Sequence, residues 1–172
     1  SGKPGDSFEA TDDAGTRALV DAAKAAGTGH FIYVSVDCDA FPDSPLVAAK
    51  RSVEEYLKAS GVAYTILKPG PFMEIWLGPM LGVDAANGTA KVFGSGDRPV
   101  PYVSVRDVAE YVVSCVDNRE MRDRVVYVKP AAAVSQNDAV HLFEATFGRP
   151  FEVTRIPEEA LEAQWRAAPD PM

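Results

Sequence analysis

Lys50 is the residue whose surroundings in the sequence most clearly suggest chemistry. The segment 46–57, LVAAKRSVEEYL, is predicted to form an amphipathic helix, because at about 100° per residue its apolar side chains share one face. Lys50 points within that apolar face, whereas Glu54 falls outside it. A buried ammonium group is unfavourable unless hydrogen-bond acceptors or a ligand meet it. Two interpretations follow: Lys50 contacts a bound ligand, or it extends to solvent or pairs with Glu54.

The segments around Lys50 are typical of a parallel sheet with crossover helices. The expected order is helix, strand, helix and strand, over residues 12–26, 30–36, 45–60 and 62–68. The two strands are continuous β-branched and aromatic runs, which is typical of strands buried on both faces. A right-handed crossover starts its helix at the edge where the first strand ends, and ligands bind outside that edge. We therefore expect Ser35, Lys50 and the loop from Pro69 to Phe72 to converge at one edge of the sheet.

This edge is predicted to offer contacts for a cofactor and a pocket for a substrate. The acceptors expected for Lys50 are the sugar hydroxyls of a bound cofactor. Pro69 and Gly70 stop the second strand and let the backbone approach a ligand closely, although the same residues also make an ordinary turn. An apolar cluster follows, suited either to line a pocket for a flat or aromatic substrate or to pack in the core. Its members are Phe72, Met73, Ile75 and Trp76.

The other candidates for chemistry are weaker. Cys38 lies at the same edge between two aspartates, whose negative charges disfavour a thiolate nucleophile. His30 is expected at the opposite end of its strand and His141 on a helix face, so both are predicted to be structural. Gly94 and Gly96 are followed by Asp-Arg-Pro and not by a helix. They therefore do not form the phosphate-binding turn that a dinucleotide needs.

The composition excludes several classes of function. The 172 residues suffice for one domain with a hydrophobic core, and the net charge of −8 argues against binding to a nucleic-acid backbone. No apolar run approaches the roughly 18 residues of a membrane span. The 2 cysteines and 2 histidines define neither a disulfide framework nor a metal site. We expect a protein of a reducing compartment, the cytoplasm, without a membrane, nucleic-acid or metal partner.

The rest of the chain is predicted to continue in the same domain. The expected elements are a short helix, two strands, a helix, a strand, a helix, a strand and a terminal helix, over residues 72–81, 89–95, 98–105, 105–116, 124–129, 139–148, 151–156 and from 157 onward. Capping patterns at Ser104–Asp107 and Ser135–Asp138 indicate two of the helix starts. We expect residues 1–172 to form a single α/β domain, in which 72–104 and 130–172 make a substrate-side subregion.

Three segments together resemble one known family. They read DDAGTRALVDAAKAAGTGHFIYVSV, SPLVAAKRSVEEYLKASGVAYTILKPGPFME and VSVRDVAEYV, and the resemblance covers about residues 10–165. The chain is similar in these segments to the NmrA-like branch of the atypical short-chain dehydrogenases/reductases. The resemblance implies a parallel, doubly wound Rossmann-type sheet, NADP or NAD as the cofactor, a small-molecule substrate, and a monomer or homodimer. It also implies that this chain is the later part of such a domain, with roughly 70–110 further residues upstream that hold the Gly-rich strand–turn–helix part.

The resemblance also assigns roles to single residues. Lys50 matches the lysine that hydrogen-bonds the nicotinamide ribose, and it would be the catalytic residue of this chain. The residues matched to cofactor binding are Ser35, Val36, Lys50, Pro69, Gly70 and Phe72. The residues matched to the substrate pocket are Phe72, Met73 and Trp76.

The chain departs from the family pattern where the chemistry would occur. The usual catalytic tyrosine stands four residues before the lysine, and this chain has Leu46 there, which cannot donate a proton. The usual Ser/Thr position holds Val36 or Asp37, and Ile75 replaces the asparagine of the family's FMEN segment. The leading hypothesis is an NAD(P)-dependent reductase that transfers hydride to a carbonyl, quinone or enone, with Lys50 or a water as the acid or with little need of one. The alternative is a non-catalytic NAD(P)-binding redox sensor, regulator or scaffold.

Overall fold

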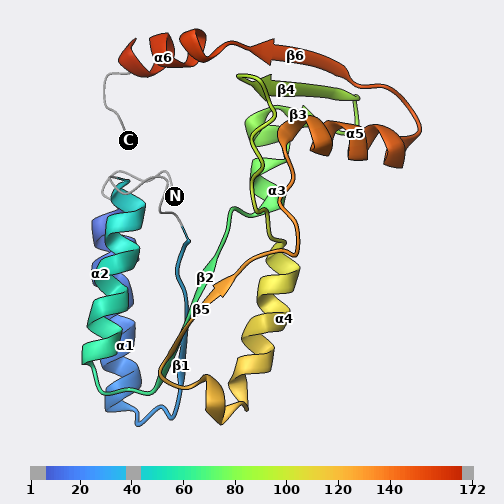
Figure 1. The fold of residues 1–172 in the computed structure, drawn as a ribbon. Coiled ribbons are helices and arrows are strands. Elements are labelled where there is room, and N and C mark those ends of the chain that lie inside the picture. The colour runs from blue at the N-terminus through green and yellow to red at the C-terminus, as the bar shows by residue number, and fades with distance from the viewer. Residues whose placement is uncertain (1–6, 38–43, 168–172) are drawn as a thin grey trace. The chain divides into compact units, whose positions relative to one another are not determined.

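The computed structural model describes residues 7–37 and 44–167, and these form two compact units. Unit 1 comprises Ser1–Gly70 and Arg106–Val128, and unit 2 comprises Pro71–Val105 and Lys129–Met172. Figure 1 shows the elements that make up each unit. The role of residues 72–104 and 130–172 in substrate binding stays a prediction. Cys38 lies outside the described residues.

Unit 1 is built on a three-stranded parallel sheet whose strand order is β1-β2-β5. The strands are β1 (Phe31–Val34), β2 (Tyr64–Pro69) and β5 (Arg124–Val128), and the helices are α1 (Thr16–Ala25), α2 (Pro45–Ala59) and α4 (Val105–Val116). In Figure 1 the sheet lies between the α1–α2 pair and α4. The sheet is parallel because each connection between its strands contains a helix, as the alternating sequence pattern predicts.

The core of unit 1 joins α1 and α2 to one face of this sheet. Val20, Val53, Leu57 and Ile66 are fully buried, and the ring of Tyr33 packs among them. The helix that carries Lys50 begins as the sequence predicts, because Ser44 occupies the N-cap position and Pro45 the first turn. It ends before Gly61, which adopts a φ of +80°.

Three expectations for unit 1 are wrong. The strand β1 is not buried on both faces: Phe31, Ile32 and Val34 are half-buried, because in the described part of the chain β1 is an edge strand that pairs with β2 alone. Residues Glu9–Gly15 form a π-helix (η1) instead of the α-helix predicted from residue 12. Glu54, predicted to lie outside the apolar face of α2, is buried at 5% exposure.

Unit 2 contains a second three-stranded sheet, of order β3-β4-β6. Its strands are β3 (Val83–Asp84), β4 (Thr89–Phe93) and β6 (Glu152–Ile156), and its helices are α3 (Met73–Trp76), η2 (Pro79–Leu81), α5 (Gln136–Phe147) and α6 (Glu158–Ala167). β4 pairs antiparallel with β3 and parallel with β6. A core cluster of Ala90, Val92, Val140 and Phe151 holds α5 on this sheet. The capping box predicted at Ser135–Asp138 starts α5 and is confirmed.

Prolines explain where the elements of unit 2 differ from the prediction. The helix predicted over 72–81 is divided into α3 and η2, because Pro79 follows Gly78 and cannot continue α3. The strand predicted over 98–105 is wrong: it makes only single bridges, one of them between Val100 and Val134. Pro99 and Pro101 lack the N–H groups that a ladder requires.

Two absences hold for the residues that the structure describes. None of their helices is both long and apolar enough to span a bilayer. Their histidine, cysteine and acidic side chains nowhere gather into a set of three that could hold a metal ion.

Candidate functional site

The carboxyl ends of β1 and β2 form an ordered edge in unit 1, which we call the strand-end edge. The parallel pairing of the two strands continues past the end of β1 at Val34. The amide of Ser35 donates to the carbonyl of Leu67 at 2.8 Å, and the amide of Asp37 donates to the carbonyl of Pro69 at 2.8 Å. The backbone on both sides of this edge is therefore fixed by hydrogen bonds.

Lys50 lies on α2 with its ammonium directed to charged and aromatic partners. Its Nζ is 3.3 Å from Oδ1 of Asp12, which η1 supplies, and 5.3 Å from the centroid of the Tyr33 ring. The Lys50 side chain is 21% exposed. The alternative in which Lys50 pairs with Glu54 is wrong for the described structure, because the Glu54 carboxylate contacts Ser35 and Lys68 instead.

Ser35 was predicted at the strand-end edge, but its buried partners there, Glu54 and Lys68, were not predicted as part of the site. The hydroxyl of Ser35 donates to Oε1 of Glu54. The ammonium of Lys68 lies 3.2 Å from Oε1 and 3.3 Å from Oε2 of the same carboxylate. The Lys68 and Glu54 side chains are 13% and 6% exposed. One signal could have found this pair: Lys68 is a cation in an otherwise apolar strand, and such a cation requires an anion nearby.

Tyr33 places a phenol under Lys50. The residue is 6% exposed, and its hydroxyl has no hydrogen-bond partner among the residues that the structure describes. Burial raises the pKa of Tyr33 well above its ordinary value, and the negative charges of Asp12 and Glu54 raise it further. Tyr33 therefore stays neutral, and its ring contributes a cation–π contact that holds the Lys50 ammonium in place.

The loop after β2 is closed by backbone contacts on the unit 1 side. Pro69 and Gly70 are buried, and the Gly70 amide donates to the carbonyl of Val128 at 3.2 Å. Val36, which follows Ser35, is half-buried. The edge thus presents little free backbone, and Lys50 is its partly exposed ammonium group.

The apolar cluster of unit 2 is more exposed than core packing would allow. Met73, Ile75 and Trp76 are 38%, 42% and 43% exposed, and Phe72 is half-buried. Packing in the interior of unit 2 therefore does not account for Met73, Ile75 and Trp76. Glu74, in the same short helix, accepts hydrogen bonds from the amide of Val105 at 3.0 and 3.2 Å.

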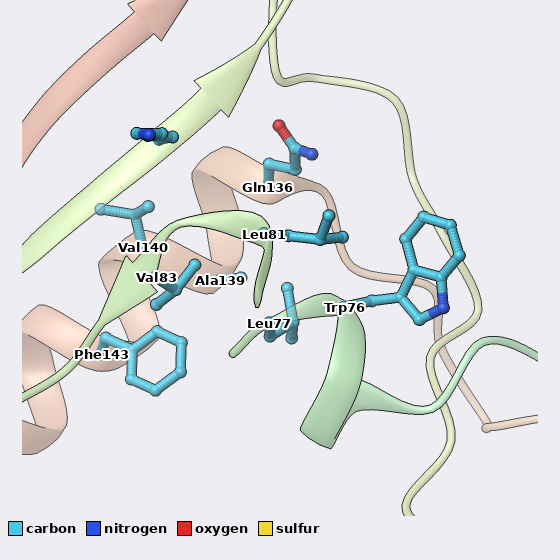
Figure 2. Close-up of a pocket in the computed structure, with 9 residues that line it drawn as sticks. Trp76, Leu77, Leu81, Val83, Gln136, Ala139, Val140 and Phe143 are labelled. Carbon is cyan, nitrogen blue, oxygen red and sulfur yellow. The ribbon is translucent and has the colours of Figure 1, made fainter. Parts of the chain in front are cut away.

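Trp76 lines a cavity within unit 2 that Figure 2 shows in close-up. Its walls are mostly apolar and come from α3, η2, β3 and α5: Leu77, Leu81, Val83, Ala139, Val140 and Phe143. Lys91 and Gln136 supply its polar groups. Oε1 of Gln136 accepts from the amide of Phe93 at 2.8 Å, so the side-chain NH₂ is the group left to face a ligand. Phe72 and Met73 are not among the lining residues.

The size of this cavity limits what it holds without rearrangement. Its volume is about 10 Å³, which suffices for one water molecule. A neighbouring cavity of about 200 Å³ shares Leu81 and Lys91 with it and reaches Ile156. The larger of the two cavities is thus below the roughly 300–1,000 Å³ that is usual for ligand pockets.

A nicotinamide cofactor fits the strand-end edge in one respect, whereas the residues that the structure describes show no phosphate-binding turn for it. The ammonium of Lys50 has three N–H groups, and within residues 7–37 and 44–167 it forms an ion pair with Asp12 at 3.3 Å. A partly exposed ammonium of this kind matches the sugar hydroxyls of a nucleotide. Gly94 and Gly96 are not followed directly by a helix, since irregular chain leads from them to α4. The other glycine-rich segment, SGKPG, lies outside the described residues.

Comparison with known proteins gives a family and several relatives. The NmrA-like family matches residues 9–172. Isoflavone reductase homolog IRL of Zea mays is 32% identical over 166 residues, which are 90% of this chain and 53% of that protein. Photosystem II assembly factor Ycf39 of Cyanophora paradoxa is 29% identical over 149 residues, 86% of this chain and 46% of that protein.

A solved structure, AtPrR2 with NADP+ and (+)pinoresinol, is similar to this chain with a TM-score of 0.73 and 22% identity, and the match covers 89% of this chain and 53% of that one. The predicted fold class, α/β with a parallel Rossmann-type sheet, is thereby confirmed. The chain spans about half the length of the relatives it matches.

Proposed function

We propose that this chain, which belongs to the NmrA-like family, acts in an NADP(H)-dependent reductase of a small carbonyl, quinone or enone substrate. Two of the named relatives support a reductase: the isoflavone reductase homolog by its name, and AtPrR2 by its bound NADP+. NADP is the proposed cofactor, and NAD is the alternative cofactor under the same proposal.

The observation that carries the proposal is the position of Lys50. It stands in the crossover helix that follows β1, close to the strand-end edge where parallel sheets bind ligands. Its ammonium is partly exposed, contacts the Tyr33 ring, and forms an ion pair with Asp12. A lysine held in this way is prepared to donate to the hydroxyls of a ribose.

The proposal assigns the other residues as follows. Ser35 and Val36 lie beside the nicotinamide, and Pro69 and Gly70 bring the backbone close to it. NADPH supplies the hydride. The substrate is proposed to bind where Phe72, Met73 and Trp76 are gathered, because Met73 and Trp76 are exposed apolar side chains that suit an aromatic or alicyclic ring.

A second candidate is a non-catalytic NAD(P)-binding sensor or scaffold. Two observations favour it. Leu46 stands four residues before Lys50, where the family's usual proton donor would be. Ycf39, 29% identical to this chain, is named as an assembly factor and not as an enzyme. Under this candidate Lys50 binds the cofactor and transfers nothing.

The experiment compares Lys50→Met with Lys58→Met in the gene product that contains this chain. Lys58 is the matched control, because it lies on the same helix and pairs with the exposed Glu55. A hydrogen bond from a charged donor is worth about 1.5–3 kcal/mol, so Lys50→Met should weaken NADPH binding about 10- to 150-fold. Lys58→Met should change it less than about threefold.

NADPH oxidation is then measured with a panel of quinones, enones and aldehydes. Turnover that falls in Lys50→Met supports the reductase. Tight NADPH binding without turnover on any substrate would refute it in favour of the sensor. Equal binding by both variants would remove Lys50 from the site.

A further inference from the structure

Glu54 connects three elements at the strand-end edge. It is carried by α2, its carboxylate accepts the hydroxyl proton of Ser35 just past β1, and it pairs with the ammonium of Lys68 near the end of β2. Ser35 and Lys68 come one residue after Val34 and Leu67, which are opposite each other in the sheet register. The two side chains are therefore neighbours, and a single carboxylate meets both.

Burial makes this arrangement specific. Ser35 and Glu54 are each 5% exposed, and the Lys68 side chain is 13% exposed. At such sites water cannot replace a lost partner, so each group holds the other two in one geometry. The ring of Tyr127 on β5 lies 5.7 Å from the Lys68 ammonium and limits its movement on the other side.

The rest of the helix surface shows that the burial of Glu54 is not incidental. Glu55 is the next residue along α2, and its side chain is 74% exposed in an ion pair with Lys58. Two adjacent glutamates thus have opposite environments. A buried ion pair is seldom worth more stability than apolar residues of the same volume. Its presence here calls for a reason other than stability.

We infer that Glu54 is a positioning residue that fixes the carboxyl ends of β1 and β2 where the cofactor is proposed to bind. The link to the cofactor rests on the proposed function, whereas the link to the strand ends rests on the contacts alone. The carboxylate holds the Lys68 end of β2, and the loop from Pro69 to Gly70 follows directly from it. Because the Ser35 hydroxyl donates its single hydrogen bond to Glu54, its oxygen can only accept a hydrogen bond from a ligand.

The first test measures amide hydrogen exchange in Glu54→Gln and Glu55→Gln by NMR. Both variants remove one negative charge from the same helix. Two amides report on the strand ends: that of Asp37, which donates to Pro69, and that of Gly70, which donates to Val128. The amide of Phe31, which donates to Ala63 at the opposite end of β1, is the internal control.

We expect Glu54→Gln to speed exchange at Asp37 and Gly70 by about tenfold or more while Phe31 is unchanged, because the buried ammonium then lacks its anion and the strand ends open locally. Glu55→Gln should leave all three amides as in the wild type. An equal acceleration at all three amides would mean that Glu54 acts on global stability only, and would overturn the inference. Unchanged exchange at Asp37 and Gly70 would overturn it as well.

The second test measures NADPH affinity in the same two variants of the gene product. Glu54→Gln should raise the dissociation constant about tenfold relative to Glu55→Gln. If both variants bind NADPH equally well, Glu54 does not position the cofactor edge. If the wild type itself does not bind NADPH, the proposed function fails, and the exchange experiment still decides whether Glu54 positions the strand ends.

Discussion

Replacing Gly96 by alanine is expected to destabilise unit 2 by about 2–5 kcal/mol. Gly96 has a φ of +76°, and an L-residue there costs roughly 1–2 kcal/mol. A Cβ at this position would lie 2.3 Å from Cγ1 of Val92 and 2.9 Å from Oδ1 of Asn137. Val92 is fully buried on β4 and cannot withdraw, so overpacking adds about 1–3 kcal/mol.

Gly148 provides the matched control for the backbone part of this cost. Its φ is +64°, close to that of Gly96, and a Cβ there would meet no atom within 4 Å. Gly148→Ala should therefore cost only the conformational part, about 1–2 kcal/mol. The difference between the two variants isolates the steric contribution of the Gly96 contact with Val92.

Urea unfolding followed by tryptophan fluorescence reads out unit 2 directly. The chain has 2 tryptophans, Trp76 and Trp165, and both belong to unit 2. The unfolding midpoint of Gly96→Ala should fall further than that of Gly148→Ala with the same m-value. Equal midpoints would refute the reasoning, because they would show that Val92 gives way. A larger loss for Gly96→Ala would support a packing role for the Gly94-x-Gly96 turn, which resembles a nucleotide loop only in its spacing.

Two further predictions concern charge. Lys68→Met leaves the Glu54 carboxylate buried without its cation and should lower the free energy of unfolding, measured in urea, by about 3–5 kcal/mol. The double variant Glu54→Leu/Lys68→Met should recover most of this loss. A loss below about 1 kcal/mol for Lys68→Met alone would contradict a buried ion pair. The Ser135 hydroxyl and amide lower the pKa of Asp138 below its ordinary 3.8, so the ionised cap adds stability above that value, which is lost as the pH falls through the lowered pKa. The wild type should therefore exceed Asp138→Asn in free energy of unfolding by a margin that is constant well above pH 3.8 and shrinks as the pH falls below it. A margin that stays constant in acid would argue against the capping role.

The strand-end edge could be predicted because it depends on connectivity. The helix, strand, helix and strand order over 12–68 requires parallel pairing, and parallel pairing brings Ser35 and Pro69 to one edge. The family predicted from the same segments is confirmed over residues 9–172. The position of Lys50 follows from the helical period alone, since its offset from Leu46 and Val53 places it among the apolar residues.

The burial of Glu54 could not be predicted from the helical period, because it depends on which side chain of the neighbouring strand faces it. Helical spacing tells which residues share a face, but Lys68 supplies the countercharge from β2, and Asp12 takes Lys50 from η1. Both partners are distant in sequence. The apolar cluster at Phe72 was ambiguous for the same reason, since its spacing suits a core or a pocket equally. Met73, Ile75 and Trp76 are exposed and Phe72 is half-buried, and the pocket stays a prediction.

The side chains of the strand-end edge restrict how a substrate could receive its proton. Leu46 has no acidic proton, and the Ser35 hydroxyl already donates a hydrogen bond to Glu54. Tyr33 is buried, and burial raises its pKa, so its phenol neither reaches a substrate nor ionises. The Lys50 ammonium is paired with the carboxylate of Asp12 at 3.3 Å. If the proposed function holds, the side chains described at this edge favour a quinone, which spreads the charge of an arriving hydride over its conjugated ring, over an aldehyde, whose alkoxide needs a proton at once.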